Sequence, residues 1–342
     1  MNGNERILAA LRRQQPDRIP TFEWFIDAAV GQALTGSKAL FDIVERLDID
    51  GINIRADYAK RFDDDVHFTD EWGIKKKLTS DALPGVMGSP IPDILEQQNY
   101  RFPDPAAPGR FATVEAALTR FGGDKAIVLN LRDGFSDMRD LLGYEQALMS
   151  MILEPQAFAD LLDRVVDYNV ELARIASERY GLKIVATTDD IANRGGLLFS
   201  PESYMELMAP RFKRVIQGYK SLGYLCVKHC DGLIDDVLDF WVECGIDCID
   251  PVDPDAGYRM ADFKQKYGNR ICLKGNIDCK ELLSNGTTAE VEQAVKDCIR
   301  DGGRNGGLIL SSSNTIHSGV KPENYRAMLN ALHAYGTYPL PG

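Results

Sequence analysis

Eight short apolar runs alternate with helical stretches along this chain of 342 residues. The runs cover residues 19–25, 49–54, 126–131, 183–188, 224–231, 246–249, 270–274 and 307–310. Most are continuously apolar rather than alternating, which is typical of strands buried on both faces of a parallel sheet. The pattern predicts an α/β protein, a (β/α)8 TIM barrel formed as a single domain over residues 1–342. A doubly wound sheet would need a glycine fingerprint after the first run, and residues 22–27 contain none.

Residues 58–125 interrupt this alternation. The stretch Phe68–Lys77 predicts a hairpin with Gly73 in its turn, and the proline-rich residues 84–108 predict a surface excursion. We therefore expect an N-terminal helical and hairpin insertion at 58–125 that lines or covers the mouth of the barrel.

The charge and the cysteines limit the classes of partner and compartment. A formal net charge of −12 without a basic patch argues against nucleic acid and against an anionic membrane surface, and no apolar run is long enough to span a bilayer. The seven cysteines lie in the second half, most of them in apolar runs, which favours buried free thiols in a reducing cytoplasm. A cytoplasmic protein is predicted. Its oligomeric state stays open, with a homodimer as one option.

Polar side chains follow every predicted strand. They are Glu23 and Trp24, Arg55, Asn130, Asp189 and Asp190, His229 and Asp231, Asp250 and Asp253, Asn276 and Asp278, and Asn314 with His317. The carboxyl ends of the strands meet at one face of a barrel, so residues distant in the sequence can form one site there. We expect substrate contacts from Glu23, Trp24, Arg55, Asn130, Asn314 and His317.

His229 and Asp231 are the sharpest candidates for chemistry. In an extended chain both side chains point the same way, and Cys230 points into the core. A neutral imidazole and a carboxylate can ligate zinc, with Asp190, Glu202, Glu206 or His317 as a third ligand. Alternatively His229 donates to a carboxylate and shapes the pocket, or acts as an acid–base group.

A family resemblance covers nearly the whole chain. Its carrying segments, specific only when taken together and in order, are NERILAALRRQQPDRIP, FTDEWGIKKK, DDIANRGGLLFSPESYMELMAPRFKRVI, KHCDG, GIDCIDPVDP, GNIDCKELLSNGTTAEV, GGLILSSSN and KPENYRAML. The chain resembles the uroporphyrinogen decarboxylase superfamily, whose members include decarboxylases and corrinoid-linked methyltransferases, and the resemblance implies a (β/α)8 barrel. True decarboxylases carry an arginine-rich segment soon after the first strand. Here PTFEWFIDAAV has no arginine, so a polyanionic tetrapyrrole is a poor substrate.

The resemblance also bears on the metal ligands. The methyltransferase branch that feeds a thiol acceptor places zinc on a His-x-Cys and on a later cysteine. His229 matches the histidine, but Asp231 stands at the first cysteine position and a residue near Asn314 at the later one. Sulfur ligands favour thiolate chemistry, whereas a harder His/Asp/Glu set acts as a Lewis acid on an oxygen.

The function implied by this resemblance is that of a corrinoid-dependent methyltransferase, the O-demethylase component. It would demethylate a small methyl donor, for which we expect a methoxylated aromatic, and pass the methyl group to the Co(I) corrinoid of a partner protein. Asp190, His229 and Asp231 would act on the ether oxygen by protonation or through zinc. No DxHxxG corrinoid-binding pattern occurs in the chain, so the corrinoid, or methylcobalamin, is expected on a separate corrinoid protein.

Three alternatives remain. The first is a decarboxylase of a smaller carboxylic acid, in which Arg55 or Arg132 holds the carboxylate and Asp190 donates the proton. The second is a methylcobalamin:thiol methyltransferase. The third is a non-catalytic barrel that binds a corrinoid or another ligand.

Overall fold

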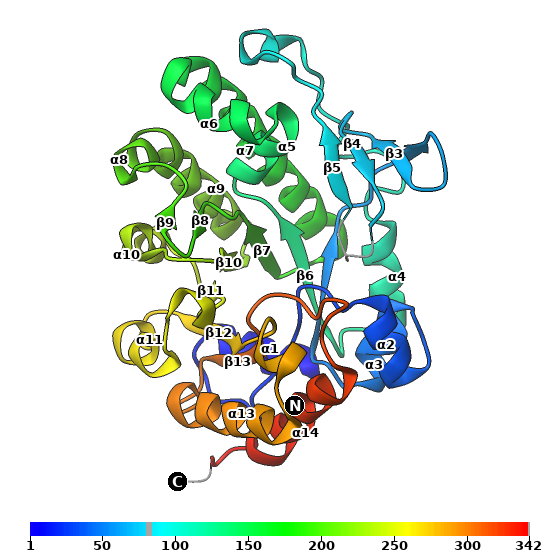
Figure 1. The fold of residues 1–342 in the computed structure, drawn as a ribbon, viewed down its shortest axis with the longest axis vertical. Helices are drawn as coiled ribbons and strands as arrows, with labels where there is room; N and C mark the ends of the chain where they lie inside the picture. The colour runs from blue at the N-terminus through cyan, green and yellow to red at the C-terminus, as the bar shows by residue number, and fades with distance from the viewer. Residues whose placement is uncertain (80–83, 341–342) are drawn as a thin grey trace.

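A curled parallel sheet forms the centre of the computed structural model, which describes residues 1–79 and 84–340 (Figure 1). Its seven strands pair in chain order: β1 (Gly51–Arg55), β6 (Ala126–Leu131), β7 (Ile184–Thr188), β10 (Leu225–His229), β11 (Cys248–Asp250), β12 (Cys272–Ile277) and β13 (Leu308–Ser312). All six pairings are parallel. The predicted α/β barrel is therefore confirmed, and all carboxyl ends of its strands lie at one mouth.

The expected first strand, residues 19–25, is not a regular strand, and on this point the prediction was wrong. The segment is extended and closes the gap between β13 and β1, where Pro20 O accepts from Leu310 N at 3.0 Å. Proline has no N–H to give to a ladder. One further bond is between backbone groups, from Asp50 N to Thr21 O at 2.9 Å. Side chains make others: the Glu23 carboxylate accepts from Ser312 N at 3.1 Å, and Asn53 Nδ2 donates to Trp24 O at 2.8 Å.

Helices surround the sheet and complete the β/α alternation. The outer layer consists of α2 (Ala28–Thr35), α3 (Leu40–Arg46), α4 (Ala112–Phe121), α5 (Phe135–Leu142), α6 (Tyr144–Leu153), α7 (Pro155–Tyr180), α8 (Pro201–Ser203), a π turn (Tyr204–Met208), α9 (Ala209–Ser221), α10 (Asp235–Cys244), α11 (Met260–Tyr267), α12 (Leu282–Asn285), α13 (Thr288–Gly302) and α14 (Pro322–Tyr335). Helix α1 (Gly3–Leu11) packs against β1, β6 and β13.

A second sheet stands to one side of the barrel (Figure 1). It is antiparallel, in the order β2 (Lys60–Phe62), β3 (His67–Asp70), β4 (Lys75–Lys77) and β5 (Gly85–Gly88), and its β3–β4 pair is the predicted hairpin with Gly73 in the turn. A 3-10 helix (Ile94–Asn99) follows, and α4 then returns the chain to β6. Residues 80–83 of the predicted insertion at 58–125 lie outside the described residues.

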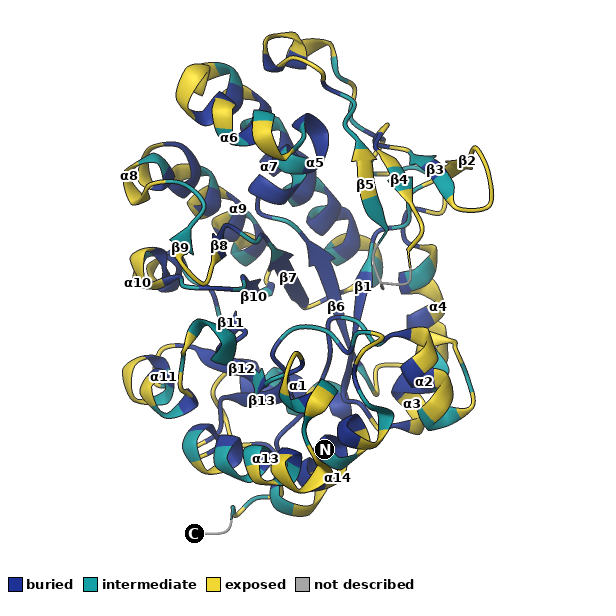
Figure 2. Ribbon diagram, viewed as in Figure 1, coloured by how far each residue is buried: buried dark blue, intermediate teal, exposed yellow. Residues whose placement is uncertain are grey.

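The barrel strands are buried and the outer faces of the helices are exposed (Figure 2). All seven cysteines are free and buried, as predicted, and Cys230 is only 1% exposed. A short hairpin, β8 (Ala192–Asn193) and β9 (Gly196–Leu197), follows β7 at the mouth. Within the described ranges, no helix has the length and apolar character needed to cross a membrane.

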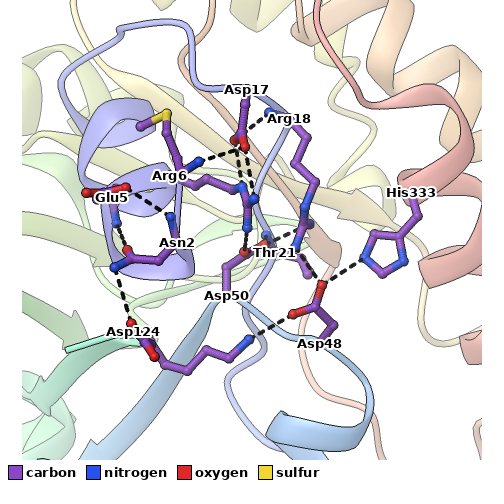
Figure 3. A network of polar contacts seen from close by, with 12 residues as sticks. Asn2, Glu5, Arg6, Asp17, Arg18, Thr21, Asp48, Asp50, Asp124 and His333 are labelled. Atoms are coloured by element: carbon purple, nitrogen blue, oxygen red, sulfur yellow. Dashed lines mark hydrogen bonds and ion pairs between the residues drawn. The ribbon is translucent and has the colours of Figure 1, made fainter. Parts of the chain in front are cut away.

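The amino end of the barrel is fastened by an ionic network around Asp50, directly before β1 (Figure 3). The buried Asp50 carboxylate accepts from Thr21 N at 3.0 Å, from Arg6 at 3.1 Å and from Arg18 at 3.0 Å. Arg6 also donates to Asp17 at 2.6 Å. The network ties the N-terminal helix and the gap-closing segment to β1, at the opposite end of the barrel from the strand exits, where a stabilising role is expected.

Asp17 gives this network a pH dependence. Its hydrogen bonds to Arg6 hold the pKa of Asp17 well below the ordinary value of 3.8. The pair therefore stabilises the folded state above that value, and the stabilisation is lost as the pH falls below it. We expect the Tm of Asp17→Asn to fall less steeply than that of the wild type on acidification below about pH 4. Thermal melts should show a small difference, because Asp17 is 43% exposed, and Asp65→Asn, at another exposed acid, should follow the wild type.

Candidate active site

Four of the predicted site residues meet at the mouth of the barrel. His229 ends β10, opposite Thr188 of β7, and Asp190 follows two residues after Thr188. His229 Nε2 lies 3.8 Å from Asp190 Oδ1 and 3.7 Å from Asp231 Oδ1. Asn314, which follows β13 across the barrel, donates from Nδ2 to the other oxygen of Asp231. The fold thus assembles one polar cluster from three separate strand exits.

Asp250, at the end of β11, fixes the orientation of the imidazole. Its Oδ2 lies 2.7 Å from His229 Nδ1 and also accepts from Trp24 Nε1, while its Oδ1 accepts from Lys274 Nζ at 2.8 Å. Burial raises the pKa of Asp250, but Lys274 and His229 outweigh burial and leave that pKa below its ordinary value. An ionised Asp250 accepts from Nδ1–H, so Nε2 of His229 is the nitrogen that faces the two carboxylates.

Aromatic packing holds the same ring from its side. The Trp24 and His229 rings meet edge to face with centroids 4.7 Å apart. The Lys274 ammonium lies 5.3 Å from the Trp24 ring and 4.7 Å from that of Phe22. The ring contacts and the hydrogen bonds together leave the imidazole little freedom to turn. A metal ligand or a catalytic base needs such a fixed orientation.

The cluster fits a metal cation. Candidate ligand atoms of Asp190, His229 and Asp231 lie within 4.8 Å of one another. Asp231 Oδ1 is buried and has no hydrogen-bond partner within residues 1–79 and 84–340, an expensive arrangement for a carboxylate. Burial raises the pKa of Asp231 to about 7 against the opposing effect of His229. One nitrogen and two oxygens are ligands that zinc accepts, and a three-ligand set leaves a position for substrate.

Of the four candidates for a third ligand, Asp190 is the one that lies beside His229 and Asp231. The structure places the other candidates elsewhere: Glu202 and Glu206 are exposed on the helical segment after β9. His317 Nδ1 accepts from Gly319 N at 3.1 Å, and its Nε2 lies 3.3 Å from Cys279 O.

Glu23 lies in the segment that closes the barrel between β13 and β1, and its carboxylate holds this segment to β13. Its carboxylate is buried and accepts from the backbone N–H and, at 2.6 Å, from the hydroxyl of Ser312. Burial raises the pKa of Glu23 to about 7, although Lys274 and Ser312 oppose this shift. Asp189, which precedes Asp190, is likewise occupied, because it accepts from the backbone N–H of Phe135 at 2.6 Å.

Arg55 and Asn130 line a separate cavity of about 340 Å³ between the barrel mouth and the four-stranded sheet. They are direct partners in the β1–β6 register. Arg132 lines the same cavity, and its guanidinium lies 2.8 Å from Asp140 and 3.1 Å from Asp137.

The sequence pattern did not predict two residues of the His229 site. Asp250 is only one of several polar residues that follow a predicted strand, and Lys274 is only the last residue of an apolar run. The lysine in this apolar run could have indicated that an acid lies beside it, because a lysine is rarely buried without a partner. The same signal occurs at Lys228 of β10, whose buried ammonium lies 2.8 Å from Asp133.

Comparison with known proteins shows which family this chain belongs to. The family model described as uroporphyrinogen decarboxylase (URO-D) matches residues 54–335. A methylated-thiol–coenzyme M methyltransferase of Methanosarcina mazei is 25% identical over 227 residues, 65% of this chain and 58% of that protein. A uroporphyrinogen decarboxylase of Pseudoalteromonas translucida is 26% identical over 190 residues, 53% of this chain and 49% of that protein. The chain thus spans about half the length of these two curated relatives.

A solved structure supports the same fold over the full length. A methyltransferase from Methanosarcina mazei superposes with a TM-score of 0.80 at 19% sequence identity, covering 98% of this chain and 99% of that one. The fold is therefore shared even where the sequences have diverged. With the family model matching most of the barrel, the chain belongs to the uroporphyrinogen decarboxylase (URO-D) family.

Proposed function

We propose that this protein is the substrate-side methyltransferase of a corrinoid system. It would take the methyl group of a small methyl ether, a methoxylated aromatic in our proposal, and pass it to the Co(I) corrinoid of a separate, cytoplasmic partner protein. The support is the similarity to a methyltransferase over 227 residues together with the His229 cluster at the barrel mouth.

The observation that carries the proposal is the set of donors around His229 Nε2. Asp190 and Asp231 supply oxygens, and within the described part of the chain no cysteine belongs to the cluster. Asn314 stands near the position where the resemblance to the thiol branch expects a cysteine, and it donates to Asp231 instead. A zinc ion held by these three residues would supply Lewis acidity toward an oxygen rather than thiolate activation.

The residues of the chain have defined tasks in this reaction. The group that leaves the methyl carbon of an aryl methyl ether is a phenoxide, and its departure is helped when the ether oxygen is protonated or coordinated. Where no metal is bound, Asp231 with its raised pKa would be the group that holds a proton within the cluster. Asp250, Trp24 and Lys274 keep His229 in orientation, and Asn314 keeps Asp231 in place. The nucleophile, Co(I), needs no base from this chain.

An assay of purified wild-type protein tests the proposal. Under anaerobic conditions with zinc and chemically reduced cobalamin, methoxybenzoates should yield methylcobalamin and the phenol, followed by absorbance and chromatography. The same protein should neither release CO₂ from the corresponding acids nor methylate a thiol from methylcobalamin. Formation of CO₂ without methyl transfer would establish the decarboxylase alternative, and methylation of a thiol would establish the thiol methyltransferase.

A further inference from the structure

The cavity beside β1 contains one arginine whose charge is already neutralised. Arg132 lies within 3.1 Å of Asp137 and 2.8 Å of Asp140, and the other oxygen of Asp137 accepts from Asn169 at 2.9 Å. These two acids and Arg132 form a closed set. Burial would lower the pKa of Arg132, but Asp140 and Asp137 more than compensate and raise it.

Arg55 differs from Arg132 in having no such partner. Across residues 1–79 and 84–340, its guanidinium makes no hydrogen bond or ion pair and only lies 5.1 Å from the ring centre of Phe25. Burial and the neighbouring Arg132 lower the pKa of Arg55 to about 10, which still leaves it cationic at neutral pH. Asp137 and Asp140 act on this charge from a distance, but their oxygens already accept from Arg132, Asn169 and Arg139. The five N–H donors of Arg55, a residue that lines the cavity, therefore have no acceptor within the described residues.

Asn130 adds a second unsatisfied donor next to Arg55. Thr188 Oγ1 lies 2.6 Å from Asn130 Oδ1 and 3.0 Å from Leu131 O, so its one proton is shared between these two oxygens, and the Asn130 amide nitrogen is turned away from Thr188. That nitrogen, Nδ2, is buried and has no partner within the described part of the chain. A buried donor left without an acceptor costs free energy, so the pair is suited to an acceptor that arrives with a ligand.

Neighbouring strands connect the cavity to the His229 cluster. The strand order β1–β6–β7–β10 leads from Arg55 through Asn130 and Thr188 to His229. Asp190 contributes to the electrostatic field at Arg55, so the two groups lie within the range of direct Coulomb interaction, on the order of 10 Å. Arg55 lies over the Phe25 ring, and Trp24, the residue before Phe25, packs against His229, so consecutive aromatic residues contact the two groups.

We propose that Arg55 and Asn130 form a carboxylate-binding subsite, and that the methyl donor is a methoxylated aromatic acid. This inference rests on the proposed function and adds the class of substrate. Arg55 would bind the carboxylate through two parallel N–H donors, Asn130 would add a third, and the methoxy end would then reach the His229 cluster.

Charged and uncharged methyl donors of similar size, tested on arginine variants and a control variant, test the subsite. The three methoxybenzoate isomers should be compared with the corresponding methoxybenzamides, which are similar in size but uncharged. In the wild type, kcat/KM for the best acid should exceed that for its amide by about 10- to 100-fold. Arg55→Gln should remove this preference by lowering kcat/KM for the acid alone, and Arg55→Lys should keep part of it. Arg300→Gln, at a 60% exposed arginine of α13, should behave as the wild type.

Binding of unreactive ligands separates the subsite from the methyl transfer. In calorimetry, benzoate should bind equally well to the wild type and to Arg300→Gln. Benzamide should bind the wild type at least about tenfold more weakly than benzoate does, and benzoate should bind Arg55→Gln at least about tenfold more weakly than it binds the wild type. If benzoate binds in this way but no methoxybenzoate loses its methyl group, the subsite stands and the proposed function fails. If acids and amides are demethylated equally by the wild type and by Arg55→Gln, the methyltransferase stands and the subsite is wrong. Circular dichroism of each variant shows that the fold is intact.

Discussion

His229→Ala is expected to leave the folded protein without zinc and to lower the rate of methyl transfer by a factor on the order of 10³. His229 Nε2 is the one nitrogen of the cluster, and Asp190 with Asp231 alone would give a weak, purely oxygen site. Metal content should fall from about one zinc per chain, after zinc loading and a wash with a mild chelator, to a background level. Element analysis of the gel-filtered protein measures it directly.

A matched histidine provides the control for this expectation. His333 of α14 is partly exposed and lies 4.0 Å from Asp48, at the amino end of the barrel. His333→Ala should keep both the zinc and the rate. Retention of a full equivalent of zinc by His229→Ala would contradict the ligand assignment. Absence of zinc from the loaded wild type, with methyl transfer intact, would instead leave Asp231 and His229 as proton donors without a metal.

Much of this site could be predicted from the sequence because the parallel strands pair in chain order. Once each apolar run is a strand, its last residues must lie at the common mouth, and His229, Asp231, Asp190 and Asn314 meet for that reason. The choice among neighbouring acids could not be predicted in the same way. Asp189 and Asp190 are adjacent, yet one accepts from the backbone of α5 and the other faces His229, and only the path of the loop decides this.

The first strand shows the limit of reading apolar runs. Residues 19–25 are as apolar and as buried as the true strands, but their hydrogen bonds are a mixture of isolated backbone bonds and bonds to the side chains of Glu23 and Asn53. Burial is encoded by composition, whereas a ladder depends on free backbone N–H groups, and Pro20 has none. The distinction between Arg55 and Arg132 has a similar origin, because it depends on how the turn into α5 places Asp137 and Asp140.

Lys228→Met should lower the free energy of unfolding by about 3–5 kcal/mol, the largest stability loss that we expect from a single substitution here. Lys228 lies within β10, is 1% exposed, and holds its ammonium 2.8 Å from Asp133 and 4.9 Å from the Trp241 ring centre. It also donates to Asp189 O at 3.2 Å. Burial raises the pKa of Asp133 well above its ordinary value, and Lys228 is the cation that opposes this shift. Without Lys228, Asp133 and Asp189 are two buried acids with no cation between them.

Lys220→Met is the matched control, because Lys220 pairs with Asp247 at 2.6 Å but is 35% exposed. Its loss should cost at most about 1 kcal/mol. Chemical unfolding followed by tryptophan fluorescence and circular dichroism measures both variants. Adding Asp133→Asn to Lys228→Met should recover part of the lost stability, because only one buried acid, Asp189, then remains without a cation. The assignment of Lys228 as counter-ion would be wrong if its variant were no less stable than Lys220→Met, or if the added Asp133→Asn lowered stability further.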